Sequence, residues 1–283
     1  MLLLDAMKKR SSALRRLGRS ERTIVFYEFW IRQLDAYLLL HEIEQISLSQ
    51  LRAFVDSLVD RHLSKSSRRG AAMTLRVFFR WCVDECLLPS NPADRLEMCK
   101  TDRKVPDTFD VSEILALLNQ AAGSKHPERD MLLIALLTET GLRLSEVSGL
   151  TVRDVNLEAR IVLVMGKGGR QRFVPFADAA DKLMADYLKV RDCAGASLFG
   201  LTASGIRLAL RRLGDKVGIK ATPHKFRRTS ATLTARAGGG AYFLQQKFGW
   251  ESQQVAKFYI DLAQMDDQMA RTSPLDRFVL PKR

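Results

Sequence analysis

Apolar and polar residues in the first part of the chain recur with the period of amphipathic α-helices. Apolar side chains fall at steps of three and four over residues 24–38, which predicts a helix that begins near Ser20. Ser47 and Gln50 have the spacing of a capping box and predict the start of a second helix. A third amphipathic helix is expected at 66–86. The first part of the chain is therefore predicted to be a helical bundle.

A polar, basic stretch divides the chain into two parts. It follows a Leu-Pro-Ser-Asn-Pro segment, which ends the third helix because proline cannot continue it. We predict a helical N-terminal domain at 1–90, a linker at 91–106 and a second domain at 107–283 that includes a C-terminal tail.

The second part also begins with helical patterns. Asp110 and Glu113 have capping-box spacing, and the nearly continuous apolar run at 130–138 indicates a buried helix. The apolar segment and the basic segment on either side of the glycine-rich stretch 166–169 predict a β-hairpin. The expected fold is mainly α, with a small β-hairpin or sheet in the second of two domains.

Composition adds a partner class to this fold. The chain has 45 Lys and Arg against 32 Asp and Glu, a formal net charge of +13, and 46% hydrophobic residues, so it folds and carries a surplus of cations. Such a surplus favours a polyanion, nucleic acid before a membrane surface, although a generally basic protein would look the same. We find no signal peptide and no apolar run long enough to span a bilayer, and we expect a cytoplasmic, nucleoid-associated protein.

Cations on two predicted helices are candidate DNA contacts. They lie on the third helix and on another expected at 203–214, where arginine and lysine can bind phosphate. The simpler alternative is that these charges only solvate the faces of the helices. The candidates are Lys65, Arg68, Arg69, Arg76, Arg80, Arg207 and Arg211.

A His and an Arg come together at the start of a further predicted helix. Thr222 is a suitable N-cap and Pro223 suits the first helical position, while Gly238 is placed to end the helix. His224 and Arg227 are three residues apart and so share a face near the positive end of the helix dipole. This arrangement attracts phosphate.

A second candidate is an arginine among apolar residues. The segment Thr-Gly-Leu-Arg-Leu-Ser-Glu-Val places Arg143 in a predicted core helix, where an unpaired charge is costly. Glu146, three residues later, can pair with it. From these residues alone, a structural ion pair is the better account.

Together these motifs resemble the tyrosine recombinases, the phage integrase family. The resemblance covers about 107–260, and the helices with the segment 76–81 (Arg-Val-Phe-Phe-Arg-Trp) more weakly resemble the family's SAM-like core-binding domain. Arg228 stands where the family often has a second His, and many members have His where this chain has Trp. The family's order of catalytic residues maps onto Arg143, Lys167, His224, Arg227, Trp250 and Tyr259, with Glu146 as a supporting residue.

The resemblance implies a role for each of these residues in phosphodiester transfer. Tyr259 would be the nucleophile, and nearby cations would have to favour its phenolate, because a phenol has a pKa of about 10. The two arginines, Arg143 and Arg227, would bind the phosphate. His224 would accept and donate a proton. The remaining two would act at the edge of the site: Lys167 would protonate the departing 5′ oxygen and Trp250 would donate a hydrogen bond.

The resemblance further implies how the enzyme works on DNA. A two-domain, C-shaped clamp would close round duplex DNA with short inverted half-sites, without metal, ATP or another cofactor. The short stretch before Ser20 suggests a simple Xer-like or Cre-like enzyme without an arm-binding domain. Leu262, Met265 and Met269, with a second apolar group after Ser273, would dock on a neighbouring protomer in a tetramer. The tail could instead fold back on its own domain.

Two other functions share much of this pattern. A type IB topoisomerase uses similar chemistry on one duplex, and a catalytically silent DNA-binding regulator could keep the same scaffold. The intact set of catalytic residues argues against the regulator, and the compact N-terminal bundle argues against the topoisomerase. The expected function is site-specific DNA recombination through a 3′-phosphotyrosyl intermediate.

Overall fold

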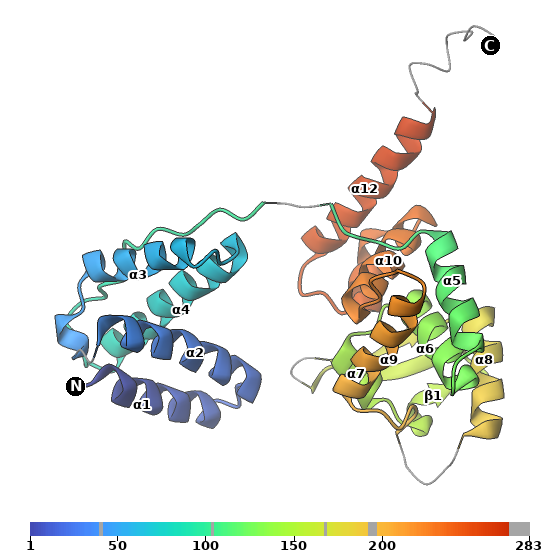
Figure 1. Cartoon of the computed structure of the whole chain (residues 1–283), viewed down its shortest axis with the longest axis horizontal. Helices are drawn as coiled ribbons and strands as arrows, with labels where there is room; N and C mark the ends of the chain where they lie inside the picture. The colour runs from blue at the N-terminus through green and yellow to red at the C-terminus, as the bar shows by residue number, and fades with distance from the viewer. Residues whose placement is uncertain (40–41, 103–104, 167–168, 192–196, 272–283) are drawn as a thin grey trace, which may run out of the picture. The chain divides into compact units, whose positions relative to one another are not determined.

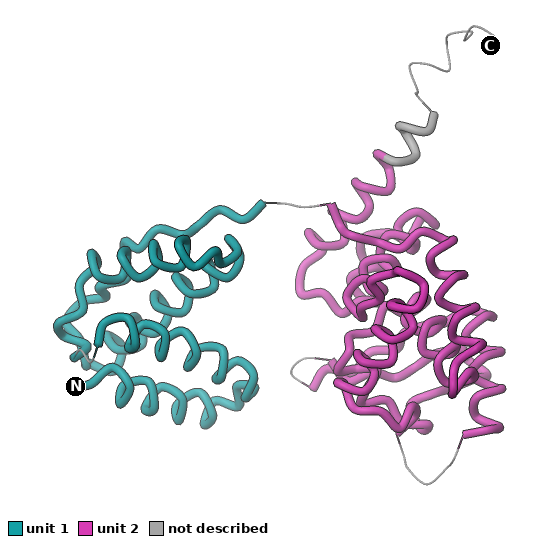
Figure 2. Tube along the Cα trace, in the orientation of Figure 1, with its two compact units in different colours: residues 1–104 teal, residues 105–283 magenta. Residues whose placement is uncertain are grey.

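The computed structural model describes residues 1–39, 42–102, 105–166, 169–191 and 197–271, with side chains described up to residue 265. The chain forms two compact units, residues 1–104 and 105–283 (Figure 2). No helix in these ranges is both long enough and apolar enough to cross a membrane.

The first unit is a helical bundle, as predicted. Ser20 caps a helix by accepting a hydrogen bond from the backbone N–H of Thr23, and the predicted capping box of Ser47 and Gln50 is present. One further helix, which the sequence pattern does not predict as a separate element, precedes these two. The elements are α1 (Leu3–Arg16), α2 (Glu21–Leu38), η1 (Ile43–Gln45), α3 (Leu48–Asp60) and α4 (Lys65–Asp84).

Apolar residues from all four α-helices fill the core of this unit. Leu3, Leu34, Phe54 and Phe79 come from α1, α2, α3 and α4 in turn, and each is fully buried. After α4 the segment 88–102 continues within the same unit (Figure 2).

The second unit is mostly helical around one buried helix, α6 (Pro127–Thr140) (Figure 1). Residues 132–137 of α6 are all buried, so the apolar run indicated a buried helix correctly. The remaining helices are α5 (Val111–Ala122), α7 (Leu144–Gly149), η2 (Val152–Asp154), α8 (Asp178–Val190), α9 (Ala203–Lys216), α10 (Pro223–Arg236), α11 (Ala241–Phe248) and α12 (Gln253–Arg271).

The described strands form one antiparallel sheet in the order β1-β2-β3. The predicted hairpin is β2 (Ile161–Met165) and β3 (Gln171–Pro175), and it gains a two-residue edge strand, β1 (Val155–Asn156). Val164 pairs with Arg172 across the hairpin. The fold is thus mainly helical with a small sheet, as expected.

Candidate active site

The N-terminus of α10 presents one exposed and one buried basic side chain. Thr222 caps the helix by accepting a hydrogen bond from the Lys225 N–H at 3.2 Å, and Pro223 takes the first helical position, as predicted. His224 is exposed, whereas Arg227 on the next turn is only 7% exposed. The capped turn therefore places the imidazole at the surface and the guanidinium beneath it.

The carbonyl end of α11 collects three arginines from three different elements. The helix ends where Gly249 turns into the left-handed conformation (φ 57°), so its last carbonyl groups lack helical partners and carry the negative end of the dipole. Each carbonyl accepts a hydrogen bond from a different guanidinium: Lys247 O from Arg172 Nε at 3.0 Å, Phe248 O from Arg227, and Gly249 O from Arg143 Nη2 at 3.1 Å.

Arg227 has a second anchor on the other side of the site. Its Nη1 donates to Gly141 O, at the end of α6, over 2.8 Å. Two carbonyl groups from helices far apart in sequence therefore fix the plane of the Arg227 guanidinium. Burial, followed by the charge of Arg143, lowers the pKa of Arg227 to about 10, so it still carries its charge at neutral pH.

Glu146 is the buried carboxylate of the site. Its side chain is 3% exposed and accepts hydrogen bonds from the backbone N–H of Arg143 at 2.7 Å and from Arg143 Nη1 at 3.0 Å. Arg172 forms a bidentate ion pair with the same carboxylate, through Nη1 to Oε1 at 2.9 Å and Nη2 to Oε2 at 3.0 Å. Burial acts to raise the pKa of Glu146, but the bonds from Arg172 and Arg143 outweigh it and the pKa is lowered. The predicted Arg143–Glu146 pair is present and belongs to a larger network.

An aromatic stack leads from α11 to the candidate nucleophile on α12. The Trp250 ring lies nearly parallel to the Tyr259 ring, with centroids 5.4 Å apart and an angle of 5° between the planes. Trp250 also stacks on the Phe248 ring, with centroids 4.9 Å apart. Arg227 lies over the Phe248 and Trp250 rings at 5.3 and 5.8 Å. Tyr259 is thereby held next to the arginine-rich end of α11.

Burial and positive charge act in opposite directions on the pKa of Tyr259. Burial raises this pKa, while the charges of Arg228 and Arg227 lower it by less, so the phenol is protonated at neutral pH without DNA. The cations expected beside the nucleophile are present, but they do not by themselves yield a phenolate. The pKa of His224 is lowered, first by partial burial and then by the charges of Arg228 and Arg227.

The sequence analysis missed two basic residues that act on this site. Arg172 was passed over within the basic strand, although the alternation of a strand places it on the same face as the buried Val174. That alternation was a usable signal. Arg228, noted only as a departure from the family pattern, contributes charge at both Tyr259 and His224. Lys167, between β2 and β3, lies outside the described residues.

The expected DNA contacts on α4 touch the segment that follows the helix. Arg76 donates to the backbone oxygen of Asp94 at 2.6 Å, Arg80 lies 3.4 Å from the Asp94 carboxylate, and Arg69 donates to Cys99 O at 3.3 Å. Lys65 bonds both carboxylate oxygens of Asp102 at 2.9 Å. Arg68 is half-buried, while Arg207 and Arg211 are exposed one turn apart on α9.

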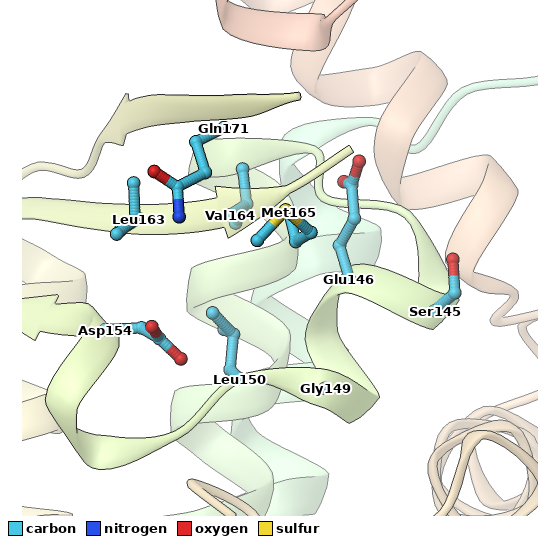
Figure 3. A pocket seen from close by; sticks show the side chains of 9 residues that line it. All are labelled: Ser145, Glu146, Gly149, Leu150, Asp154, Leu163, Val164, Met165 and Gln171. Atoms are coloured by element: carbon cyan, nitrogen blue, oxygen red, sulfur yellow. The ribbon is translucent and has the colours of Figure 1, made fainter. Parts of the chain in front are cut away.

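A hollow of about 250 Å³ lies beside the site and is too small for duplex DNA (Figure 3). It lies between α7, η2 and the β2–β3 hairpin, and Glu146, Asp154 and Gln171 line it. Of the candidate catalytic side chains that the structure describes, none faces it. Within the described ranges, no group of three or more His, Cys, Asp or Glu residues could hold a metal ion.

Comparison with known proteins finds a family match for each part of the chain. The model of the phage integrase family matches residues 107–265, and that of the phage integrase N-terminal SAM-like domain matches residues 6–87. The chain is 28% identical over 255 residues to tyrosine recombinase XerC of Corynebacterium efficiens, covering 86% of this chain and 82% of that protein. It is 28% identical over 260 residues to tyrosine recombinase XerD of Staphylococcus aureus, covering 86% and 88%.

A solved structure shows the same fold at low sequence identity. A lambda integrase tetramer bound to a Holliday junction superposes with a TM-score of 0.75 at 19% identity, covering 89% of this chain and 78% of that chain. The resemblance predicted from the sequence motifs is confirmed. The phage integrase family model alone matches more than half of the chain. The chain therefore belongs to the phage integrase family, the tyrosine recombinases.

Proposed function

We propose that this tyrosine recombinase cuts and rejoins duplex DNA through a covalent bond between Tyr259 and a 3′ phosphate. The observation that carries the proposal is the position of Tyr259, which stacks on Trp250 beside the end of α11 where Arg143 and Arg227 meet. Strand exchange between two sites would follow, because the same bond can be attacked by the 5′ hydroxyl of another duplex.

The side chains divide the transfer between them. Tyr259 Oη attacks the phosphorus and the bond to the 5′ oxygen breaks, with His224 accepting the phenol proton and Lys167 donating one to the leaving oxygen. A guanidinium has five N–H groups, and the contacts above use two each in Arg143 and Arg227. The others can bind the nonbridging oxygens. The negative charge of the phosphate would be neutralised in part by these two cations.

A trapping assay tests the proposal directly. A duplex nicked next to the cut loses its leaving strand after attack, so a covalent protein–DNA complex should accumulate, also in excess EDTA because arginine and lysine supply the positive charge. Strand exchange between two sites should then be seen. A covalent complex with relaxation of one duplex but no exchange would indicate a topoisomerase. Absence of any covalent complex on DNA that the protein binds would indicate a silent regulator.

The acidic limb of the pH profile should report His224. Its pKa is lowered from 6.5, so the imidazole is neutral and can accept a proton at pH 7. The second-order rate constant for cleavage should therefore fall only below pH 6.5, as His224 becomes protonated. Protonation also opposes folding: the stability that depends on neutral His224 is complete above pH 6.5 and is lost as the pH falls through the lowered value.

The measurement is single-turnover cleavage at limiting protein between pH 5 and 8, beside His224→Asn. The variant should be slower throughout and lack the acidic limb. A wild-type limb centred above pH 6.5, or an unchanged limb in the variant, would contradict the assignment.

DNA binding through α4 should compete with the acidic residues of the following segment. Lys65 and Arg80 are each within ion-pair distance of a carboxylate, Asp102 and Asp94. Phosphates must displace these carboxylates to reach the cations. Replacing both, Asp94→Asn with Asp102→Asn, should tighten binding by about 3- to 10-fold at low salt, with the gain fading as salt screens the charges.

The control for this double variant is Glu97→Gln. Glu97 lies in the same segment but pairs with Arg52 on α3, so its loss should change affinity less. Half-site binding measured by fluorescence anisotropy over a salt series decides the point. Unchanged or weaker binding by the double variant would show that the α4 cations do not contact phosphate.

The tail beyond the nucleophile is proposed to assemble protomers on paired half-sites. Leu262 is half-buried and Met265 is 60% exposed on α12, the helix that also carries Tyr259. Met269 and the apolar group after Ser273 lie outside the part whose side chains are described. The lambda integrase tetramer on a Holliday junction supports the idea. Truncation after Gln264 should leave half-site binding intact and lower strand exchange; full exchange at limiting concentration would contradict it.

A further inference from the structure

Arg172 is a largely buried arginine beside the carbonyl end of α11. It lies on β3 opposite Val164 and its side chain is 13% exposed. All three guanidinium nitrogens donate: Nη1 and Nη2 to the two carboxylate oxygens of Glu146, and Nε to the carbonyl of Lys247. One planar group thus ties β3 to α7 and to the end of α11.

Glu146, which Arg172 holds in place, in turn accepts hydrogen bonds from Arg143. Each of its carboxylate oxygens accepts one bond from Arg172 and one from Arg143, the latter through Nη1 and through the backbone N–H. Arg172 therefore fixes the plane of the carboxylate, and the carboxylate fixes the Arg143 guanidinium with the help of Gly249 O. Lysine has one nitrogen and cannot hold both oxygens and the third acceptor in one plane.

A hollow lies beside Glu146. Glu146 lines that space of about 250 Å³ together with residues of β2 and β3 (Figure 3). Close packing would hold a side chain in place by contact alone, and this space leaves a gap on one side of Glu146. Without its two hydrogen bonds from Arg172, the Glu146 carboxylate is therefore expected to rotate and to release Arg143 from its position.

We propose that Arg172 is a positioning residue, which acts through Glu146 to aim Arg143 at the scissile phosphate. The inference rests on the proposed function, in which Arg143 binds that phosphate. Arg172 itself touches no substrate. Its effect should appear in the rate of the chemical step and should depend on Arg143.

The first test is Arg172→Lys, which keeps the positive charge but loses the bidentate hydrogen bonds to Glu146. On a nicked substrate that the wild type cleaves, its single-turnover rate should fall by about 10- to 100-fold, while half-site affinity changes less than about 2-fold. The matched control is Arg160→Lys, in the turn just before β2, because Arg160 pairs with Asp178 and Asp181 rather than with Glu146. It should cleave at nearly the wild-type rate.

A double-mutant cycle separates positioning from general stabilisation. In an Arg143→Lys background, Arg172→Lys should slow cleavage by less than about 2-fold further, because residues that act as a unit are not additive. A merely structural role would give multiplying losses in the same cycle. The rate defect should also persist on a substrate with sulfur at the bridging 5′ position, because a thiolate leaves without a proton.

Three results would overturn the inference while leaving the proposed function intact. The first is a wild-type rate for Arg172→Lys, and the second is a double variant whose rate loss is the product of the losses of the two single variants. The third is recovery of the rate on the sulfur substrate, which would show that Arg172 supports the general acid. If Arg172→Lys is poorly folded by thermal unfolding, the charge-balanced pair Arg172→Gln with Glu146→Gln replaces it in the same cycle. Failure of the wild type to form any covalent complex would instead contradict the proposed function itself.

Discussion

Tyr259→Phe is expected to abolish the covalent protein–DNA complex and leave DNA binding unchanged. The substitution removes only the hydroxyl, while the ring that stacks on Trp250 at 5.4 Å stays in place. The aromatic stack, the position of α12 and the arginines at the end of α11 should therefore be preserved. The loss should be complete, because Tyr259 is the tyrosine that stacks on Trp250 beside Arg227. The measurement is denaturing gel analysis of protein trapped on the nicked duplex.

Tyr242→Phe is the control for this substitution. Tyr242 is 68% exposed on α11, and its change removes the same atom away from the stack. It should trap DNA as the wild type does. A covalent complex that forms at the wild-type rate with Tyr259→Phe would remove Tyr259 from the role of nucleophile, whatever the family resemblance implies.

Helix starts were predictable because the signals that set them are local. Ser47 and Gln50, Asp110 and Glu113, and Thr222 all cap the helices that their spacing predicted. A cap depends on side chains within one turn, so no distant residue has to be known. The β2–β3 hairpin follows for the same reason. The short strand β1 and the separate helix α1 have no comparable local signal.

The meeting of three arginines at α11 could not be predicted from spacing. Arg143 and Gly249 are hydrogen-bonded although they are 106 positions apart, and no local pattern marks the last carbonyl groups of a helix as an arginine-binding site. The family resemblance named two of these arginines by their motifs. It left out Arg172, whose burial only the alternation of β3 indicates.

The cations of α4 show a different limit of the sequence. Charge on a helix face allowed two interpretations, contact with DNA or simple solvation. The structure shows a third, in which the following segment supplies acceptors for Lys65, Arg69, Arg76 and Arg80. Net charge counts Asp94 and Asp102 but does not place them beside these cations. For this reason the DNA-binding role of α4 depends on how readily phosphate displaces them.

Arg227→Lys should reduce the single-turnover rate of cleavage by about 10²- to 10³-fold, the usual cost of losing one preorganised charged donor. The guanidinium reaches two carbonyl groups at once, Gly141 O at 2.8 Å and Phe248 O, and these bonds orient its remaining N–H groups. A lysine side chain keeps the charge but has a single nitrogen. It cannot donate to both carbonyl groups and to the phosphate in the planar arrangement that a guanidinium gives.

The same substitution should also lower stability. Arg227 is 7% exposed, so the carbonyl that Lys cannot reach is left buried without a donor, which costs about 1–3 kcal/mol. Thermal unfolding should therefore be measured with the rate, and cleavage assayed well below the midpoint. The control is Arg228→Lys on the same helix, because Arg228 acts on Tyr259 and His224 through a charge that lysine retains.

The contrast between the two neighbours decides what the site requires of Arg227. If charge alone mattered, Arg227→Lys and Arg228→Lys would both cleave at close to the wild-type rate. If planar geometry matters, only Arg227→Lys is slow, and raising the protein concentration does not restore it because binding is intact. A folded Arg227→Lys protein with the wild-type rate would show that the two carbonyl anchors stabilise the fold without orienting a donor toward the phosphate.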